Sequence, residues 1–183
     1  IEPSSKHYYQ PLWTLVGGGQ AKAATTEREE SSVMPKGATW IKNAASAFDP
    51  DNNTVTYTDG TSYEYDVLVV CPGIQLDWNR TEGLEGTLGR DGVSSNYRFD
   101  LAPRTWDFIR NLRSGTAVFT VPSGAIKCAG APQKIAYLAS ETTGENGACS
   151  TTSTSTLSCR HRGPSASRPS PTASTRSSPT TAS

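Results

Sequence analysis

Residues 54–73 read Thr-Val-Thr-Tyr-Thr-Asp-Gly-Thr-Ser-Tyr-Glu-Tyr-Asp-Val-Leu-Val-Val-Cys-Pro-Gly, and this stretch decides the predicted fold. Apolar and polar residues alternate on both sides of Asp59-Gly60, a dipeptide that favours a tight hairpin turn. Asp66-Val-Leu-Val-Val-Cys71 is instead apolar on both faces, which is typical of a buried parallel strand. A further strand is expected within residues 38–48, before the turn-forming residues 49–53. Together these segments predict a three-stranded meander that feeds a buried parallel strand.

The flanking segments alternate helix and strand signals. Pro11 and the glycines 17–19 bracket a short apolar run, as at the two ends of a short helix. Asp100 is expected to cap a second helix, and Ile1-Glu2 resembles the end of a strand. The expected helices span residues 12–16, 101–112 and 132–140, a strand spans 116–121, and loops span 20–33 and 74–99. The predicted fold class is α/β.

The composition changes abruptly at Ala148. Residues 148–183 contain 11 Ser and 8 Thr, with four Arg and no acidic residue, so their net charge is +4. Residues 1–147 carry 13 basic and 17 acidic side chains, a net charge of −4, and this acidity argues against nucleic-acid binding. The tail has too few apolar residues to form a core and is predicted to be disordered. No apolar run is long enough to span a membrane.

Cys128 is the main candidate for chemistry. It lies in Ile126-Lys-Cys-Ala-Gly-Ala-Pro-Gln-Lys134, after a strand and before a helix. The helix N-terminus and the two lysines favour a thiolate, which is a nucleophile for sulfur chemistry. The alternative is that Cys128, like Cys71, is a buried free thiol with a packing role. The spacing of cysteines and histidines predicts neither a metal site nor a disulfide framework.

Two further residues are candidates for cofactor contacts. An acidic residue at a strand end, such as Glu2, can accept hydrogen bonds from an adenosine ribose. A solvated glutamate is the alternative, because no Gly-rich loop lies about 20 residues before it. Gly73 follows the apolar strand, and a glycine there allows the backbone to approach a cofactor closely.

Three segments carry a resemblance to a known family. They are Glu2-Pro-Ser-Ser-Lys-His-Tyr-Tyr-Gln-Pro-Leu-Trp-Thr-Leu-Val-Gly17, Tyr65-Asp-Val-Leu-Val-Val-Cys-Pro-Gly-Ile-Gln-Leu-Asp77 and Lys127-Cys-Ala-Gly-Ala-Pro-Gln-Lys134. Together they resemble the sulfide:quinone oxidoreductases, best the branch with the mitochondrial enzymes, over residues 1 to about 146. The resemblance implies a flavoprotein with two Rossmann-like domains that oxidises sulfide, passes two electrons through FAD to quinone, and transfers sulfane sulfur to an acceptor.

The resemblance also implies individual roles. Cys128 matches the cysteine that forms a persulfide, and Glu2 matches the acid on the FAD ribose. Gln10 matches a further FAD contact. Ala45 matches a backbone contact near the adenine, and Gly73 matches the glycine that lies near the flavin.

The resemblance implies a division of the chain as well. Residues 1–115 would be part of an FAD-binding Rossmann-like domain with its meander, and residues 116–147 the start of a second such domain. The pyrophosphate-binding Gly-rich loop, the second redox cysteine and the membrane-associating quinone segment of the family have no match. We therefore expect a fragment that binds FAD weakly or not at all. Because a shifted reading frame from Ala148 can encode a strand, a turn and a helix, residues 148–183 are expected to be a frameshift product; a genuine disordered tail is the alternative.

Two other functions stay open. One is a non-catalytic remnant or binding fragment without flavin, and the other is an NADH:quinone flavoprotein, against which the Cys128 motif argues. For the sulfide-oxidising enzyme, we expect an intact protein peripheral to the bacterial cytoplasmic membrane or the mitochondrial inner membrane, with this fragment soluble. Its partners would be sulfide, a quinone and an undetermined sulfur acceptor.

Overall fold

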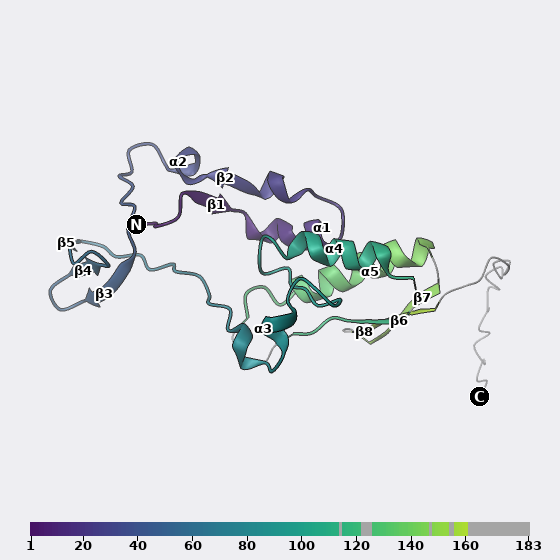
Figure 1. The fold of residues 1–183 in the computed structure, drawn as a ribbon. Coiled ribbons are helices and arrows are strands. Elements are labelled where there is room, and N and C mark those ends of the chain that lie inside the picture. Colours follow the sequence, from purple (N-terminus) through teal and green to yellow (C-terminus); the bar gives the residue numbers. More distant parts are fainter. Residues whose placement is uncertain (114, 122–125, 147, 154–155, 161–183) are drawn as a thin grey trace, which may run out of the picture.

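The computed structural model describes residues 1–113, 115–121, 126–146, 148–153 and 156–160 (Figure 1). The meander lies at one end of an elongated molecule, and the longest helices lie side by side towards the other. The helices are α1 (Trp13–Gly17), α2 (Glu30–Val33), α3 (Leu84–Thr87), α4 (Ala102–Asn111) and α5 (Ala131–Asn146), with single turns η1 (Gln10–Leu12), η2 (Ala23–Thr26) and η3 (Trp78–Arg80). The strands are β1 (Lys6–Tyr8), β2 (Glu27–Glu29), β3 (Ala45–Asp49), β4 (Thr54–Tyr57), β5 (Ser62–Glu64), β6 (Gly115–Val118), β7 (Ala148–Ser153) and β8 (Thr156–Arg160).

The predicted meander is confirmed as an antiparallel sheet of order β3-β4-β5. Val55 on the central strand pairs with Phe48 on one side and Tyr63 on the other. Tyr57 stacks on Tyr63 with ring centroids 5.2 Å apart, and both Val55 and Tyr57 are only 3% exposed. The Asp59-Gly60 turn closes the hairpin because Gly60 has a φ of +85°, a conformation that glycine adopts without strain.

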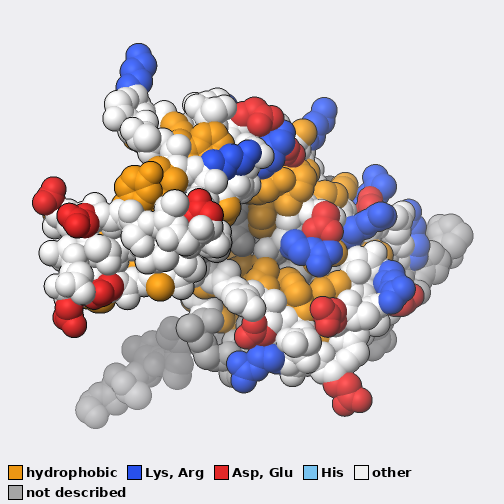
Figure 2. Space-filling model, turned by 60° about the vertical axis from the view of Figure 1, so that its left-hand side comes forward, with side chains coloured by type: hydrophobic (Ala, Val, Ile, Leu, Met, Phe, Trp, Pro, Cys, Tyr) orange, Lys and Arg blue, Asp and Glu red, His pale blue; other side chains and the backbone are white. Residues whose placement is uncertain are grey.

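The prediction of a buried parallel strand over residues 66–71 is wrong. No described residue hydrogen-bonds to the backbone of this segment, which has no regular secondary structure. Val67 is 82% exposed and Val69 is 79% exposed. A strand that is apolar on both faces needs neighbouring strands and a covering layer on each face. The described residues supply neither. Figure 2 shows that hydrophobic side chains lie at the surface of the molecule, in the hollow of this face.

The main core lies among α1, α4 and α5. Ile109 of α4 packs with Ile135 and Ala139 of α5, while Trp13 and Val16 of α1 pack with the first turn of α4. The predicted helices are therefore confirmed, although α5 continues to Asn146, beyond the expected end at residue 140. Trp106, Ile109 and Leu112 recur at the spacing of one helix face in the sequence, and the fold places all three in or against this core.

The glycines after α1 let this helix approach its neighbours. A Cβ added at Gly18 would lie 2.7 Å from the Leu138 Cδ1 atom of α5. A Cβ added at Gly19, which has a φ of +76°, would lie 2.7 Å from the Trp106 ring of α4. Real Cβ contacts are longer than this, so only glycine permits this packing.

Asp100 is not the N-cap of α4. The residue at that position is Leu101, which makes no side-chain cap. The Asp100 carboxylate instead accepts hydrogen bonds from Arg98 Nε at 2.6 Å and Nη2 at 2.7 Å. The Arg98 guanidinium therefore holds the pKa of Asp100 below its usual range.

Two predicted loops contain regular structure. Within residues 20–33, β2 pairs antiparallel with β1 and places Arg28 opposite His7. Within residues 74–99, η3 and α3 form two short helical turns. The strand expected at Ile1-Glu2 is not formed, and β1 begins at Lys6 instead.

Within the tail that was predicted to be disordered, the structure describes residues 148–153 and 156–160. Strands β7 and β8 extend the predicted strand β6 into an antiparallel sheet of order β6-β8-β7. Residues 161–183 lie outside the described residues.

Candidate functional site

The five predicted site residues fall into three places. Gln10 is hydrogen-bonded to Lys127, the residue before Cys128. Glu2 contacts the segment that leads into β3, which contains Ala45. Gly73 has no described hydrogen bond to either group and lies in the long segment between β5 and η3.

Three hydrogen bonds join Gln10, Tyr97 and Lys127 into a ring beside the turn that contains Cys128. The Lys127 ammonium donates to Gln10 Oε1, and Gln10 Nε2 donates to the Tyr97 carbonyl oxygen at 3.5 Å. The Tyr97 hydroxyl completes the ring by donating to the Lys127 carbonyl oxygen. Gln10 and Lys127 are 117 positions apart in sequence, so the fold brings together two segments of the predicted site.

Cys128 has an unusual backbone conformation. Its φ is +66°, and the other described non-glycine residues with a positive φ are Asn53 and Asp91, whose short polar side chains tolerate this region. The Cys128 carbonyl oxygen accepts a hydrogen bond from the Ala131 N–H at 3.1 Å, at the start of α5. The turn therefore holds the thiol immediately before the N-terminus of a long helix, where a negative charge is favoured.

Cys128 and Cys71 are both free and exposed. The alternative prediction of two buried structural thiols is therefore wrong, since neither side chain is enclosed by the core. For Cys128, exposure together with the constrained turn favours the prediction of a reactive thiol over that of a packed structural thiol. Next to it, burial raises the pKa of the Tyr97 hydroxyl, and the negative charge of a Cys128 thiolate adds to this effect.

Glu2 is held beside the segment that precedes β3. Its backbone N–H donates to the Ile41 carbonyl oxygen at 3.1 Å, and the Trp40 indole donates to the Glu2 carbonyl oxygen at 2.7 Å. The carboxylate accepts one hydrogen bond, from the Ser4 N–H to Oε1 at 2.7 Å, and no described residue binds Oε2. Ala45, four positions after Ile41, pairs with Tyr57 in the meander.

Gly73 adopts a φ of +78°, which explains why glycine suits this position. A Cβ added there would meet no atom within 4 Å. The surface above Gly73 is thus open to a flat group, although no described segment of the chain approaches it.

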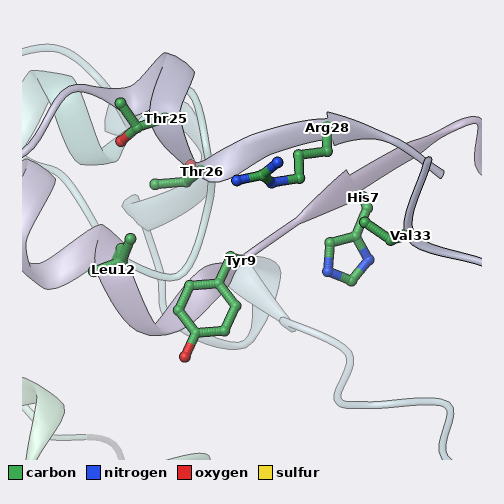
Figure 3. Close-up of a pocket in the computed structure, with 7 residues that line it drawn as sticks. All are labelled: His7, Tyr9, Leu12, Thr25, Thr26, Arg28 and Val33. Carbon is green, nitrogen blue, oxygen red and sulfur yellow. The ribbon is translucent and has the colours of Figure 1, made fainter.

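A separate pocket of about 270 Å³ lies beside β1 and β2 (Figure 3). It is lined by His7, Tyr9, Leu12, Thr25, Thr26, Arg28 and Val33. His7 Nδ1 lies 3.3 Å from Oε2 of the buried Glu30, which holds the imidazole in place. None of the five predicted site residues lines this pocket, so it is distinct from the Cys128 network.

Sequence reasoning did not identify Tyr97 as part of the site. Tyr97 falls in a stretch that was expected to be irregular, and no motif or spacing marks it. Within the described ranges, no three His, Cys, Asp or Glu side chains come close enough to hold a metal ion. Nor does any helix of the described part have the length and apolar character needed to cross a bilayer.

The comparisons with known proteins agree with the resemblance. No family model matches the chain. A protein of Dictyostelium discoideum named "Sulfide:quinone oxidoreductase, mitochondrial" is 50% identical over 139 residues, which are 75% of this chain and 31% of that protein. Proteins of the same name from Mus musculus and Schizosaccharomyces pombe are 39% identical over 138 residues and 36% identical over 144 residues, again covering 31% of each relative and 75% and 77% of this chain.

A solved structure is also similar. The sulfide:quinone oxidoreductase from the hyperthermophilic bacterium Aquifex aeolicus is 26% identical, with a TM-score of 0.48, and the match covers 60% of this chain and 24% of that one.

This chain has an α/β fold and an exposed cysteine before a helix. Because the curated relatives that it matches are oxidoreductases, the chain is a homologue of oxidoreductases. In particular, about three quarters of the chain is homologous to the sulfide:quinone oxidoreductases, so the predicted resemblance is confirmed. The chain spans about a third of the length of these curated relatives.

Proposed function

We propose that this chain is part of a flavoprotein that oxidises sulfide and passes the electrons through FAD to a quinone, with Cys128 as the residue that carries sulfur. The observation that carries the proposal is the exposed Cys128 thiol, held in a left-handed turn at the start of α5. The names of the homologous proteins support the same reaction.

The reaction at Cys128 would form one bond. A hydrosulfide ion and the Cys128 thiolate combine into a persulfide, with one new S–S bond, and release one proton and two electrons. FAD, when bound, supplies the electron acceptor between the thiol and the quinone. The turn keeps the sulfur accessible, immediately before the N-terminus of α5.

The residues that would hold FAD fit this cofactor in part. Glu2 leaves Oε2 free for a ribose hydroxyl, and Gly73 leaves open space for a flat ring. The Gln10 amide is already engaged by Lys127 and by Tyr97, so its contact to FAD would use its remaining N–H. Ala45 would contribute through its backbone, near the adenine.

The quinone gives a reason to expect the full-length enzyme at a membrane surface, because quinones with long apolar tails dissolve in the bilayer. The sulfur acceptor stays undefined. The division at residues 115 and 116 stays a prediction; α5, which follows it, packs directly against α1 and α4.

The test is sulfide-dependent quinone reduction by the full-length gene product. We expect Cys128→Ser to lower the rate by at least about 1,000-fold, because the substitution removes the nucleophile. Cys71→Ser is the matched control, since Cys71 is equally free and exposed but lies outside the hydrogen-bond ring. Full activity of Cys128→Ser would contradict the proposal.

Two further measurements separate the alternatives. A full-length gene product that is purified without a flavin absorbance spectrum would support a non-catalytic remnant. Reduction of quinone by NADH in place of sulfide would support an NADH:quinone flavoprotein. Sequencing the gene around the codon for Ala148 tests the proposed frameshift, which fails if the shifted frame does not encode a strand and a helix.

A further inference from the structure

The left-handed conformation of Cys128 needs contacts from residues outside its own turn to stabilise it. A residue with a Cβ in the left-handed region is strained by roughly 1–2 kcal/mol, and such conformations persist where surrounding structure fixes them. Cys128 lacks the short hydrogen-bonding side chain that helps Asn53 and Asp91 in the same region. Its own turn contributes the bond from the Ala131 N–H to the Cys128 carbonyl oxygen.

Tyr97 supplies a contact from another part of the fold. Its hydroxyl donates to the carbonyl oxygen of Lys127, and that carbonyl belongs to the peptide bond that sets φ of Cys128. Rotation of this peptide away from the observed turn would break the hydrogen bond. Tyr97 thus acts on the backbone torsion that is strained at Cys128.

The segment that carries Tyr97 is itself anchored. The Tyr97 N–H donates to Ser95 Oγ at 3.1 Å, and Ser94 Oγ donates to the Leu101 carbonyl oxygen at 2.8 Å, directly before α4. Leu101 is 2% exposed and Ala102 is fully buried, so this end of α4 belongs to the core. The backbone segment that carries Tyr97 is therefore anchored to the core end of α4.

We propose that Tyr97 is a positioning residue for Cys128, which holds the thiol in its left-handed turn through the Lys127 carbonyl. The inference rests on the proposed function, in which Cys128 carries sulfur, and it adds a residue to which neither the motif nor the resemblance gives a role.

The charges around the turn are consistent with this role. A tyrosine can donate to a carbonyl only while it keeps its proton, and both burial and the Cys128 thiolate raise the Tyr97 pKa. The Lys127 ammonium is turned away to Gln10 Oε1. At neutral pH, Tyr97 therefore stays a neutral donor.

The first test is amide hydrogen exchange, measured by NMR on the full 183-residue chain. In Tyr97→Phe we expect the Ala131 N–H, which bonds to the Cys128 carbonyl, to exchange about five- to tenfold faster, as expected for the loss of one hydrogen bond. The amide of Ile109 in the α4 core should exchange at an unchanged rate. Tyr137→Phe is the matched control, because it removes the same hydroxyl from an exposed position on α5.

The second test keeps Tyr97 intact and reports on its coupling to the thiol. In Cys128→Ser, the Tyr97 pKa, followed through its ring carbon resonance, should fall, because the thiolate contribution is lost while burial remains. A Tyr97 hydroxyl that lay away from the thiol would titrate identically in both proteins. Unchanged exchange at Ala131, or an unchanged Tyr97 titration, overturns the proposal. Neither experiment uses sulfide, quinone or FAD, so their failure is distinguishable from failure of the proposed function.

Discussion

Strand β4 and the segment of residues 66–71 have similar β-forming sequences and opposite structures. In β4, Val55 and Tyr57 are each 3% exposed, between two paired strands. In the segment of residues 66–71, Val67 and Val69 are 82% and 79% exposed, and the backbone is unpaired among the described residues. Apolar, β-branched residues give a segment the capacity to form a strand, but neighbouring strands decide whether it does.

The difference follows from backbone hydrogen bonding. Both edges of β4 are satisfied by β3 and β5, so its side chains can be buried without leaving polar groups unpaired. Residues 66–71 have no such partners within the described chain, so water must satisfy their N–H and C=O groups. Because this backbone lies at the surface, the apolar side chains of Val67 and Val69 are exposed with it.

The largest expected effect is on the buried strand. Tyr57→Ala removes a buried ring that stacks on Tyr63, and should destabilise the meander by about 3 kcal/mol. Val69→Ala, at an exposed position, should change stability by less than about 0.5 kcal/mol. Hydrogen-exchange mass spectrometry of the peptides that contain β3–β5 measures both. Equal losses of protection would remove the distinction between the two regions.

A smaller effect is expected on self-association. Residues 67–70, of which Val67, Val69 and Val70 are exposed, combine high hydrophobicity with strand propensity, which promotes intermolecular pairing. Val69→Lys should raise the protein concentration at which light scattering detects aggregates by about two- to fivefold. Ala24→Lys adds the same charge at an exposed position far from the run in sequence. If both variants behave alike, net charge rather than the apolar run controls association.

The smallest effect concerns the turns of the meander. Hydrogen bonds from the Thr61 hydroxyl and N–H lower the pKa of Asp59, and bonds from the Asn52 amide lower that of Asp49. A lowered folded-state pKa stabilises the fold above the unfolded value, and this stability is lost as the pH falls through the folded value.

Protection of β3–β5 should therefore be constant above about pH 5 and decline below about pH 4. Asp59→Asn should flatten part of that decline, as followed by exchange at matched pH. A decline of the same size in Asp59→Asn would show that this turn does not contribute. Residues 66–71 should exchange rapidly throughout.

Elements encoded by local chemistry were predictable. The Asp59-Gly60 dipeptide predicted the hairpin, and the spacing of Trp106, Ile109 and Leu112 predicted α4. The structure of residues 66–71 was not predictable in this way, because it depends on partners that the segment does not encode. The sequence pattern predicted Asp100 as a helix cap and did not predict the ion pair that Asp100 forms with Arg98.

The site was predictable only in part. Gln10 and Cys128 were marked through the resemblance, but no sequence pattern could show that Gln10 is hydrogen-bonded to Lys127, the residue before Cys128. The sequence did not predict a role for Tyr97, since its hydroxyl donates to the carbonyl oxygen of Lys127, which is 30 positions away. Glu2 and Ala45 do lie near the same segment, whereas Gly73 remains a prediction that rests on its conformation and open surroundings.

The ring around Cys128 also implies an order of folding events. Its hydrogen bonds join residues 10, 97 and 127, so closing it requires most of the chain to be collapsed first. Contacts of such long sequence separation form late, because the entropy of closing large loops must be overcome. A nascent or partly folded chain would thus present Cys128 as an ordinary flexible thiol, and the left-handed turn would arise only after α1, α4 and α5 have assembled.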